Sequence, residues 1–423
     1  MKSEVQVQSW RAIEALRAGV PNRDAVRELG SSQSVIEDRF RKQLAAVKDG
    51  FSSGTPVAGT LVAGDFGSGK SHLLEYLQHI ALENNFVCSK VVIGKETPLY
   101  DPAKVYNAAI QSATVPGRAG AALTEIARKL DFDSREYADF YKWVNFPNNG
   151  LSTRFAATVF VFERGKGDRT PEFSDRIIRF WSGSRIYVGA LKGWLRELGE
   201  AATYKIDKVS DKELALQRYQ FVPRLMVAAG YAGWVILIDE VELLASYTVG
   251  SRGKSYAELA RLIGKLEGDS IPGLTTVLTI TADFDSAIIQ ERNDEEKVLG
   301  KLRAGGGDAG LLSSRAERGM RVIQRDKVSL ERPTEATIHG IYDKVTAIYA
   351  SAYSWNPPMD YNADRTRSIR QHIKRWINEW DLKRLYPEYQ PDIEVTELGQ
   401  DYSERPELEA SSSDNPDAGG ANP

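Results

Sequence analysis

The chain has 423 residues, of which 42% are hydrophobic and 27% charged, with a net charge of −3; these values suit a globular protein long enough for two or three domains. Its single cysteine excludes an internal disulfide framework, and four scattered histidines form no zinc cluster, so a metal would be held mostly by oxygen ligands. No apolar stretch approaches the roughly 20 residues of a membrane span, and the N-terminus lacks a signal peptide's apolar run, so we expect a cytoplasmic protein without a membrane partner.

The N-terminal part predicts helices followed by a β-α-β unit. Apolar residues at helical spacing predict three helical segments within residues 8–49. Short apolar runs at 57–63 and 86–93 predict buried parallel strands, and residues 71–82 between them have helical spacing. A strand, glycine-rich loop, helix and strand in succession favour an α/β fold with a parallel sheet.

The middle of the chain alternates between helical segments and single strands. Residues 95–230 have mostly helical patterns, although periodicity leaves 155–162 open between a strand and a buried helix. Apolar runs at 234–238, 275–281 and 328–330 predict three further strands.

The C-terminal part predicts a helical lid and a tail. Residues 334–400 are helical in pattern and follow a core that we place at 1–333. Residues 391–423 hold nine acids and one base, which leaves a net charge of +5 for the rest, too mild to indicate nucleic acid. Residues 401–423 are rich in Ser, Pro, Asp and Gly without an apolar period, which predicts a disordered acidic tail.

The strongest motif is a phosphate-binding loop between a predicted strand and a predicted helix. Its residues fit the pattern G-x-x-x-x-G-K-[ST], in which glycines let backbone N–H groups point at a phosphate and the next helix presents its positive end. The lysine would reach the β- and γ-phosphates of ATP, and the serine hydroxyl would coordinate Mg²⁺. The candidate nucleotide-binding residues are Gly64, Asp65, Phe66, Gly67, Ser68, Gly69, Lys70, Ser71 and His72.

Acidic residues follow the strand at 234–238. Asp239, at the strand's carboxyl end, is a candidate to hold Mg²⁺ opposite Ser71. Glu240 is a candidate general base for the attacking water, which favours ATP hydrolysis over phosphoryl transfer to a metabolite. Glu242 adds a third carboxylate, which either is structural or tunes Glu240.

This arrangement resembles the additional-strand, catalytic-glutamate branch of P-loop ATPases and, within it, the AAA+ proteins. The resemblance implies a further strand whose polar residue contacts the γ-phosphate or its water. Thr281, at the end of the strand at 275–281, matches by position, and Asp283 is the second choice. A strand that simply ends in a polar loop is the alternative interpretation.

The same resemblance implies arginines that respond to nucleotide. The glycine-rich segment 305–310 predicts a mobile loop that presents Arg315 to a neighbouring subunit's γ-phosphate, with Arg318 as the alternative. In the predicted lid, Arg367 or Arg370 resembles the arginine that closes over the nucleotide. For Arg315 the alternative is a solvated loop arginine, and for the lid arginines the alternatives are a grip on DNA phosphates or a solvated face.

Four segments together resemble the P-loop ATP-binding proteins of bacterial BREX phage-defence systems, of the BrxD type, over about residues 8–390. They are RAIEALRAGVPNRDAVRELG, GDFGSGKSHLLEYL, RLMVAAGYAGWVILIDEVELL and INEWDLKRLYP. The resemblance implies other defence proteins as partners. Lys70 and Asp239 are 169 positions apart, more than a minimal AAA+ core requires, which predicts a helical insertion at about 100–230.

We therefore expect an ATPase with ATP and Mg²⁺ as cofactors, which couples hydrolysis to remodelling of partner proteins or DNA. A homo-oligomer and DNA both stay open as partners. Two alternatives also stay open: an ATP-gated switch or scaffold that recruits defence proteins without hydrolysis, and a DNA-binding loader that resembles replication initiators.

Overall fold

The computed structural model describes most of the chain. The described residues are 3–19, 22–55, 57–118, 121–165, 171–264, 271–306, 309–358, 361, 368–388 and 402–405.

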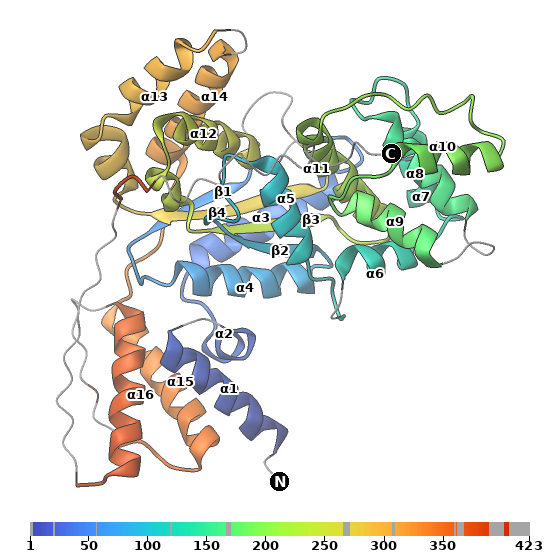
Figure 1. Ribbon diagram of the computed structural model, residues 1–423. Helices are drawn as coiled ribbons and strands as arrows, with labels where there is room; N and C mark the ends of the chain where they lie inside the picture. Colours follow the sequence, from blue (N-terminus) through green and yellow to red (C-terminus); the bar gives the residue numbers. More distant parts are fainter. Residues whose placement is uncertain are drawn as a thin grey trace, which may run out of the picture.

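A parallel sheet of five strands, in the order β2-β3-β4-β1-β5, forms the centre of the molecule (Figure 1). All five predicted strands are present. Strand β4 lies between β1 and β3, and its register pairs Thr281 with Gly64 at the carboxyl ends of the strands. The strands are β1 (Thr60–Gly64), β2 (Val87–Val92), β3 (Trp234–Asp239), β4 (Leu274–Thr281) and β5 (Val328–Ser329).

Helices cover both faces of the sheet, which explains why its strands are continuous apolar runs. In β3, Val235 and Leu237 pack with helices α3 and α4, whereas Ile236 and Ile238 join the cluster on the opposite face. Strand β4 is fully buried although it contains four threonines. Its hydroxyls have partners inside the protein; that of Thr276, for example, donates to the carbonyl oxygen of Leu262 at 2.7 Å. Helix α3 spans Ser34–Gly50, and α4 spans Lys70–Glu83.

Helices α5 to α11 fill the stretch predicted as an insertion; α5 lies over the sheet, and α6 to α10 lie beyond one end of it (Figure 1). The segment that periodicity left open is helical, because residues 155–161 of α8 are all buried and the helix has no polar face over that length. The bounds are α5 (Pro102–Gln111), α6 (Ala122–Lys129), α7 (Arg135–Val144), α8 (Thr153–Arg164), α9 (Pro171–Trp181), α10 (Val188–Glu197) and α11 (Asp211–Ala228).

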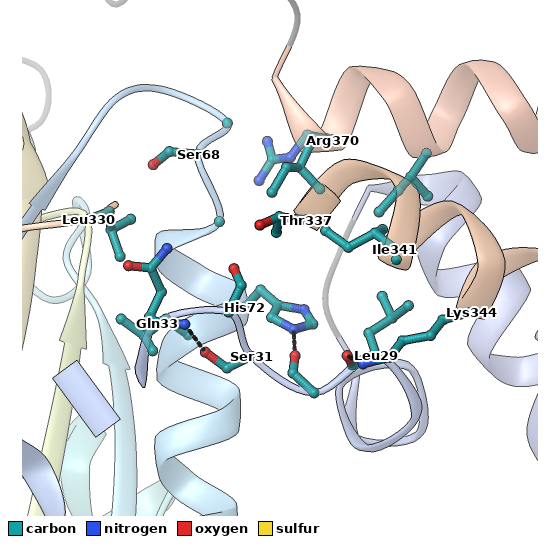
Figure 2. Close-up of a pocket in the computed structure, with 18 of the residues that line it drawn as sticks. Leu29, Ser31, Gln33, Ser68, His72, Leu330, Thr337, Ile341, Lys344 and Arg370 are labelled. Atoms are coloured by element: carbon teal, nitrogen blue, oxygen red, sulfur yellow. Dashed lines mark hydrogen bonds between the residues drawn. The ribbon is translucent and has the colours of Figure 1, made fainter. Parts of the chain in front are cut away.

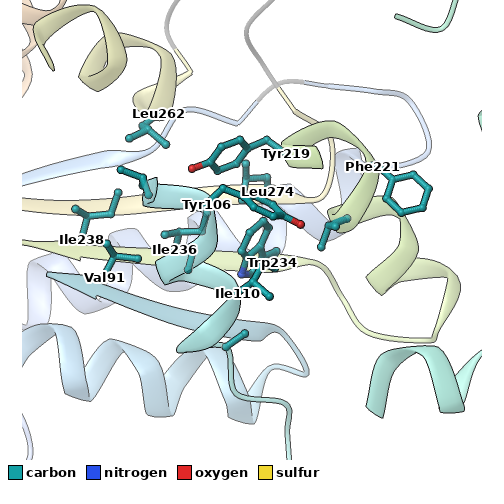
Figure 3. Close-up of a cluster of buried hydrophobic side chains, with 14 of the residues drawn as sticks. Val91, Tyr106, Ile110, Tyr219, Phe221, Trp234, Ile236, Ile238, Leu262 and Leu274 are labelled. Atoms are coloured by element: carbon teal, nitrogen blue, oxygen red, sulfur yellow. The ribbon is translucent and has the colours of Figure 1, made fainter. Parts of the chain in front are cut away.

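Three large aromatic residues join these helices to the sheet (Figure 3). The ring of Trp234 in β3 packs against Tyr106 of α5 and Tyr219 of α11, with ring centroids 6.0 and 6.2 Å apart. All three are buried, yet each polar atom has a partner; the Tyr106 hydroxyl, for example, donates to the carbonyl oxygen of Trp181 at 2.6 Å. The cluster therefore fixes the insertion to the sheet without leaving a buried polar group unsatisfied.

The segments after β3 and β4 form a second group of helices. Helices α12 and α14 approach so closely that a Cβ at Gly319 would lie 1.9 Å from the carbonyl oxygen of Tyr256, so only glycine fits there. Arg252 and Asp294 form a two-point ion pair in which both side chains are buried. The bounds are η1 (Val241–Ser246), α12 (Val249–Ile263), η2 (Asp285–Glu291), α13 (Asp294–Arg303), α14 (Ala309–Arg321) and η3 (Val322–Asp326).

The first and last helices share an apolar cluster of their own, separate from the sheet. Figure 1 shows them together below the sheet. Two large apolar residues of the N-terminal helices are exposed: Trp10 is 42% exposed, and Val35 is 58% exposed because Ile36 takes the buried place in α3. The boundaries at residues 333 and 400 stay predictions. The helices are α1 (Glu4–Ala18), α2 (Arg23–Leu29), α15 (Glu335–Tyr353) and α16 (Ile369–Leu385).

Candidate functional site

The phosphate loop joins the end of β1 to the start of α4 and touches the start of α16. Gly67 and Gly69 have φ angles of +75° and +103°, values that residues with side chains disfavour. A Cβ at Gly67 would lie 2.9 Å from the hydroxyl oxygen of Ser368, the residue that caps α16. The Ser68 hydroxyl is buried and has no hydrogen-bond partner in the described part of the chain, which fits a phosphate as its partner.

Lys70 lies in the first turn of α4, and its side chain returns to the loop. Its Nζ donates to the carbonyl oxygens of Gly64 and Asp65 at 3.0 and 3.4 Å and lies 3.6 Å from Glu242 Oε1. Both charged side chains are almost fully buried. The loop therefore holds the buried ammonium group of Lys70, and the carboxylate of Glu242 balances its charge.

Glu242 belongs to the site, which sequence reasoning left undecided. Its side chain is buried, and its Oε2 has no hydrogen-bond partner among the described residues. Burial raises the pKa of Glu242 to about 7, and Lys70 limits the rise. With a pKa near 7, this carboxyl would change its protonation state near neutral pH beside Lys70, the candidate phosphate-binding lysine.

Ser71 and Asp239, the two candidate Mg²⁺ ligands from the sequence, are in direct contact with each other. The Ser71 hydroxyl donates to Asp239 Oδ2 at 2.6 Å. Asp239 Oδ1 accepts from the Thr279 hydroxyl and from the backbone N–H of Glu240, the latter at 3.0 Å. The carboxylate is thus held by a hydroxyl of β4 and by the backbone directly after its own strand.

These two oxygen donors fit Mg²⁺, which uses one or two protein carboxylates and hydroxyls together with phosphate oxygens and water. Within the described ranges no group of three or more His, Cys, Asp or Glu side chains could hold a metal ion by itself. A cation here would therefore depend on the phosphates of the nucleotide for its remaining ligands, as the phosphate-loop motif implies.

Glu240 has an unusual backbone conformation. Its φ and ψ are +60° and +37°, a left-handed geometry that few residues other than glycine adopt and that recurs at functional sites. Burial and the neighbouring Asp239 raise the pKa of Glu240, whereas Lys70 and Arg370 lower it. The carboxylate thus lies between the acidic strand end and two cations, with a raised affinity for a proton.

Thr281 lies beside the phosphate loop, because β4 and β1 are neighbours and Thr281 pairs with Gly64. The residue is 2% exposed. Its hydroxyl contacts the hydroxyl of Tyr402 at 2.6 Å, and the Tyr402 hydroxyl donates to Asp283 Oδ1 at 2.8 Å. The two candidate sensing residues therefore meet on one tyrosine that sequence reasoning did not select.

The candidate arginines lie in different parts of the structure. Arg370 lies in the first turn of α16, with its guanidinium 5.8 Å from the ring centroid of Phe66 in the phosphate loop. Arg367 lies outside the described residues. The prediction that a mobile loop presents Arg315 is wrong, because Arg315 and Arg318 both belong to helix α14. Gly305 and Gly306 lie between α13 and α14, whereas Ala309 and Gly310 already belong to α14, so the helix presents both arginines.

A cavity of about 300 Å³ lies between the phosphate loop, α2 and the C-terminal helices (Figure 2). Leu29 and Ile341 contribute apolar wall, and Thr337 and Gln33 contribute polar groups. His72 Nε2 lies 2.6 Å from the carbonyl oxygen of Gly30, and burial lowers the pKa of this histidine. Gly67, Ser68, Gly69 and Ser71 also line this cavity, so the cavity is continuous with the phosphate loop.

Sequence reasoning missed the wall of this cavity. Gln33 Nε2 donates to the carbonyl oxygen of Glu331 at 3.0 Å, and its Oε1 accepts from the Glu331 N–H at 2.8 Å. Lys344 Nζ donates to the carbonyl oxygen of Leu29 at 2.6 Å. These contacts join segments about 300 residues apart, and no local pattern signals them.

Comparison with known proteins supplies the family. The model of the BREX system ATP-binding protein BrxC/D family matches residues 6–132 and 200–379, which include the phosphate loop, both strand-end acids and Arg370. The search of curated proteins finds no match. No helix in the described stretches is long and apolar enough to cross a membrane. The chain belongs to the family of BREX system ATP-binding proteins BrxC/D.

Proposed function

We propose that this BREX ATP-binding protein is a Mg²⁺-dependent, AAA+-like ATPase that works in the cytoplasm with other proteins of its defence system. The observation that carries the proposal is the contact of the Ser71 hydroxyl with Asp239 at 2.6 Å, next to Glu240. The position of β4 between β1 and β3 supports the additional-strand type of P-loop ATPase.

The nucleotide's two ends would bind to different parts of the site. The triphosphate would lie along the loop from Gly64 to Ser71, with Lys70 at the β- and γ-phosphates. The adenosine would enter the cavity beside Gly30 and His72, where apolar side chains cover its base. Bound Mg²⁺, held by Ser71 and Asp239, would supply charge neutralisation at the phosphates.

The protein's own groups would carry out hydrolysis. Glu240 would accept a proton from the attacking water as the water oxygen bonds to the γ-phosphorus and the bond to the ADP oxygen breaks. Thr281 would position that water, and Arg370 would add positive charge as the phosphates change. Arg315 would complete the site of a neighbouring subunit in an oligomer. Closure of the helices around the cavity would transmit the nucleotide state to partner proteins or DNA.

Steady-state hydrolysis of ATP by the full-length protein tests the proposal, with and without duplex DNA at low salt. We expect Mg²⁺-dependent turnover that Glu240→Gln abolishes, while that variant still binds ATP. Normal turnover in Glu240→Gln would remove Glu240 from the mechanism. ATP binding without turnover, in the wild type and with DNA, would instead favour an ATP-gated switch, which the engagement of Thr281 by Tyr402 also favours.

A further inference from the structure

Four residues near the C-terminus, 402–405, contact the core beside the strand-end acids (dark red in Figure 1). The sequence predicted disorder from residue 401 onward, so these contacts differ from the prediction. The backbone N–H of Arg405 donates to the carbonyl oxygen of Ser246, the last residue of η1, at 2.9 Å. The ring of Tyr402 packs edge-on against Phe284, with centroids 6.3 Å apart. A main-chain bond and an aromatic contact thus hold the segment at two points.

Glu404 provides a third point of attachment through two arginines. Its Oε1 accepts from Arg252 Nη1 and from Arg292 Nη2, each at 2.7 Å. Arg252 is itself fixed by the buried carboxylate of Asp294, and Arg292 also donates to the carbonyl oxygen of Tyr402 at 3.1 Å. The hydrogen bond from Arg252 is the main reason that the pKa of Glu404 is lowered. Arg252 and Arg292 are therefore held in place to bind one carboxylate of the tail.

The tyrosine at the other end of the segment determines where the Thr281 hydroxyl points. A phenol has one proton, and Tyr402 donates it to Asp283 at 2.8 Å. The 2.6 Å contact with Thr281 must then be a bond that Thr281 donates. The threonine's only hydroxyl proton is thus directed at the tail, and it is not free for a phosphate or a water.

We infer that residues 402–405 are an inhibitory segment of this chain, which docks on Arg252 and Arg292 and holds Thr281 away from the nucleotide. The inhibition rests on the proposed hydrolysis, whereas the docking does not. Release of the segment returns the threonine's proton to the phosphate side and raises turnover. A partner that binds Glu404 or displaces it from its two arginines would switch the enzyme on.

Full-length variants test both parts. Tyr402→Phe removes one hydroxyl and keeps the ring, and Glu404→Gln weakens the pair of charged contacts. Tyr187→Phe, at a tyrosine that is 79% exposed, is the matched control. Hydrogen exchange measured by mass spectrometry on peptides that contain residues 402–405 reports docking, and steady-state ATP hydrolysis reports inhibition.

We expect Glu404→Gln to speed exchange in these peptides, and both tail variants to raise kcat about three- to tenfold, as loss of one hydrogen bond allows. KM should stay near the wild-type value, because none of the residues 402–405 lines the cavity. Unchanged exchange in Glu404→Gln would overturn the docking. Faster exchange with an unchanged or lower kcat would overturn the inhibition. If the wild type and both variants all lack turnover, the inhibition and the proposed hydrolysis both fail, while exchange still decides the docking.

Discussion

The hydroxyl of Ser71 and the carboxylate of Asp239 meet at 2.6 Å although 168 positions separate them in the chain. The parallel sheet accounts for this contact, because β1 and β3 end at the same edge and the helix after β1 begins there. The hydroxyl and the carboxylate are two oxygen ligands of the kind that Mg²⁺ prefers. The intervening insertion lengthens the connection without displacing either ligand.

Ser71→Ala and Asp239→Asn should each raise the Mg²⁺ concentration needed for half-maximal hydrolysis, by about 10–100-fold. Each variant removes one oxygen donor and leaves the loop's backbone N–H groups intact. Nucleotide binding in the presence of a chelator should therefore stay within about twofold of wild type, a margin of about 0.4 kcal/mol. A Mg²⁺ titration of hydrolysis, with fluorescent nucleotide binding as the control, checks both expectations. An unchanged Mg²⁺ midpoint in both variants would show that the cation is held elsewhere.

The affinity for ATP should fall as pH rises through about 7, because Glu242 shares the site with Lys70. Burial raises the pKa of Glu242 from 4.5 to about 7, so the folded protein retains a proton that the unfolded chain releases. Stability from this group is therefore greatest at low pH and is lost as pH rises toward 7. An incoming γ-phosphate also favours the protonated form, because it adds negative charge beside the carboxyl.

Each proton coupled to binding changes affinity by at most about tenfold per pH unit. Glu242→Gln should bind a non-hydrolysable ATP analogue with a flatter profile between pH 6 and 8.5, leaving only the titration of the nucleotide itself. Binding curves across this range for wild type and variant give the comparison. Parallel profiles would mean that Glu242 keeps one protonation state throughout.

The sequence predicted those parts of the site whose chemistry requires particular residue types close together along the chain. The segment from Gly64 to Ser71 must curl around a phosphate and start a helix, so its glycines and lysine stand at fixed spacing. Asp239 and Glu240 must follow a buried strand directly, so an apolar run marks them. The strands were predicted for the same reason: a parallel sheet covered on both faces needs continuous apolar segments.

The remaining parts depend on contacts between distant segments, which local patterns do not contain. Tyr402 and Glu404 belong to an acidic, low-complexity tail, and the groups that bind them come from distant segments: Thr281 contacts Tyr402, and Arg252 and Arg292 contact Glu404. At Arg315 the local pattern predicted a loop where the structure has a helix. The glycines before this arginine suggested a loop, but α14 packs on α12 and stays helical past the arginine.

Arg370→Ala should weaken the binding of ATP about tenfold or more and the binding of ADP much less. The residue lies against Phe66 at the phosphate loop, and its charge acts on Glu240. A charged hydrogen bond to the γ-phosphate is worth about 1.5–3 kcal/mol, and ADP lacks that phosphate. Lys374→Ala, one turn later on α16 and outside the cavity, is the matched control. Equal weakening of ATP and ADP by Arg370→Ala would assign the arginine to general charge rather than to the γ-phosphate.

Asp294→Ala should lower the free energy of unfolding by about 3–5 kcal/mol, because it leaves the buried charge of Arg252 without its main partner. The pair is 1% and 0% exposed, and Asp294 also accepts from the Tyr256 hydroxyl at 2.8 Å. Asp139→Ala, which removes an exposed pair 3.8 Å long, should change stability by less than about 1 kcal/mol. Denaturant unfolding of both variants makes the comparison. A small loss in Asp294→Ala would show that Glu404 or water compensates the charge of Arg252.

Mixing two inactive variants should restore hydrolysis if Arg315 acts on a neighbouring subunit. Glu240→Gln lacks the base of its own site but keeps its arginine, whereas Arg315→Ala keeps the base and lacks the arginine. In a mixed oligomer, an Arg315→Ala subunit has an intact Glu240 and would receive Arg315 from a neighbouring Glu240→Gln subunit. Arg315 is half-buried in α14. An arginine of this kind typically contributes about 10³–10⁵-fold to turnover, so even a minority of complete sites gives a clear signal. Substituting Arg318→Ala for Arg315→Ala distinguishes the two candidates. Full activity of Arg315→Ala alone, or no recovery on mixing, would exclude this arginine from a neighbour's site.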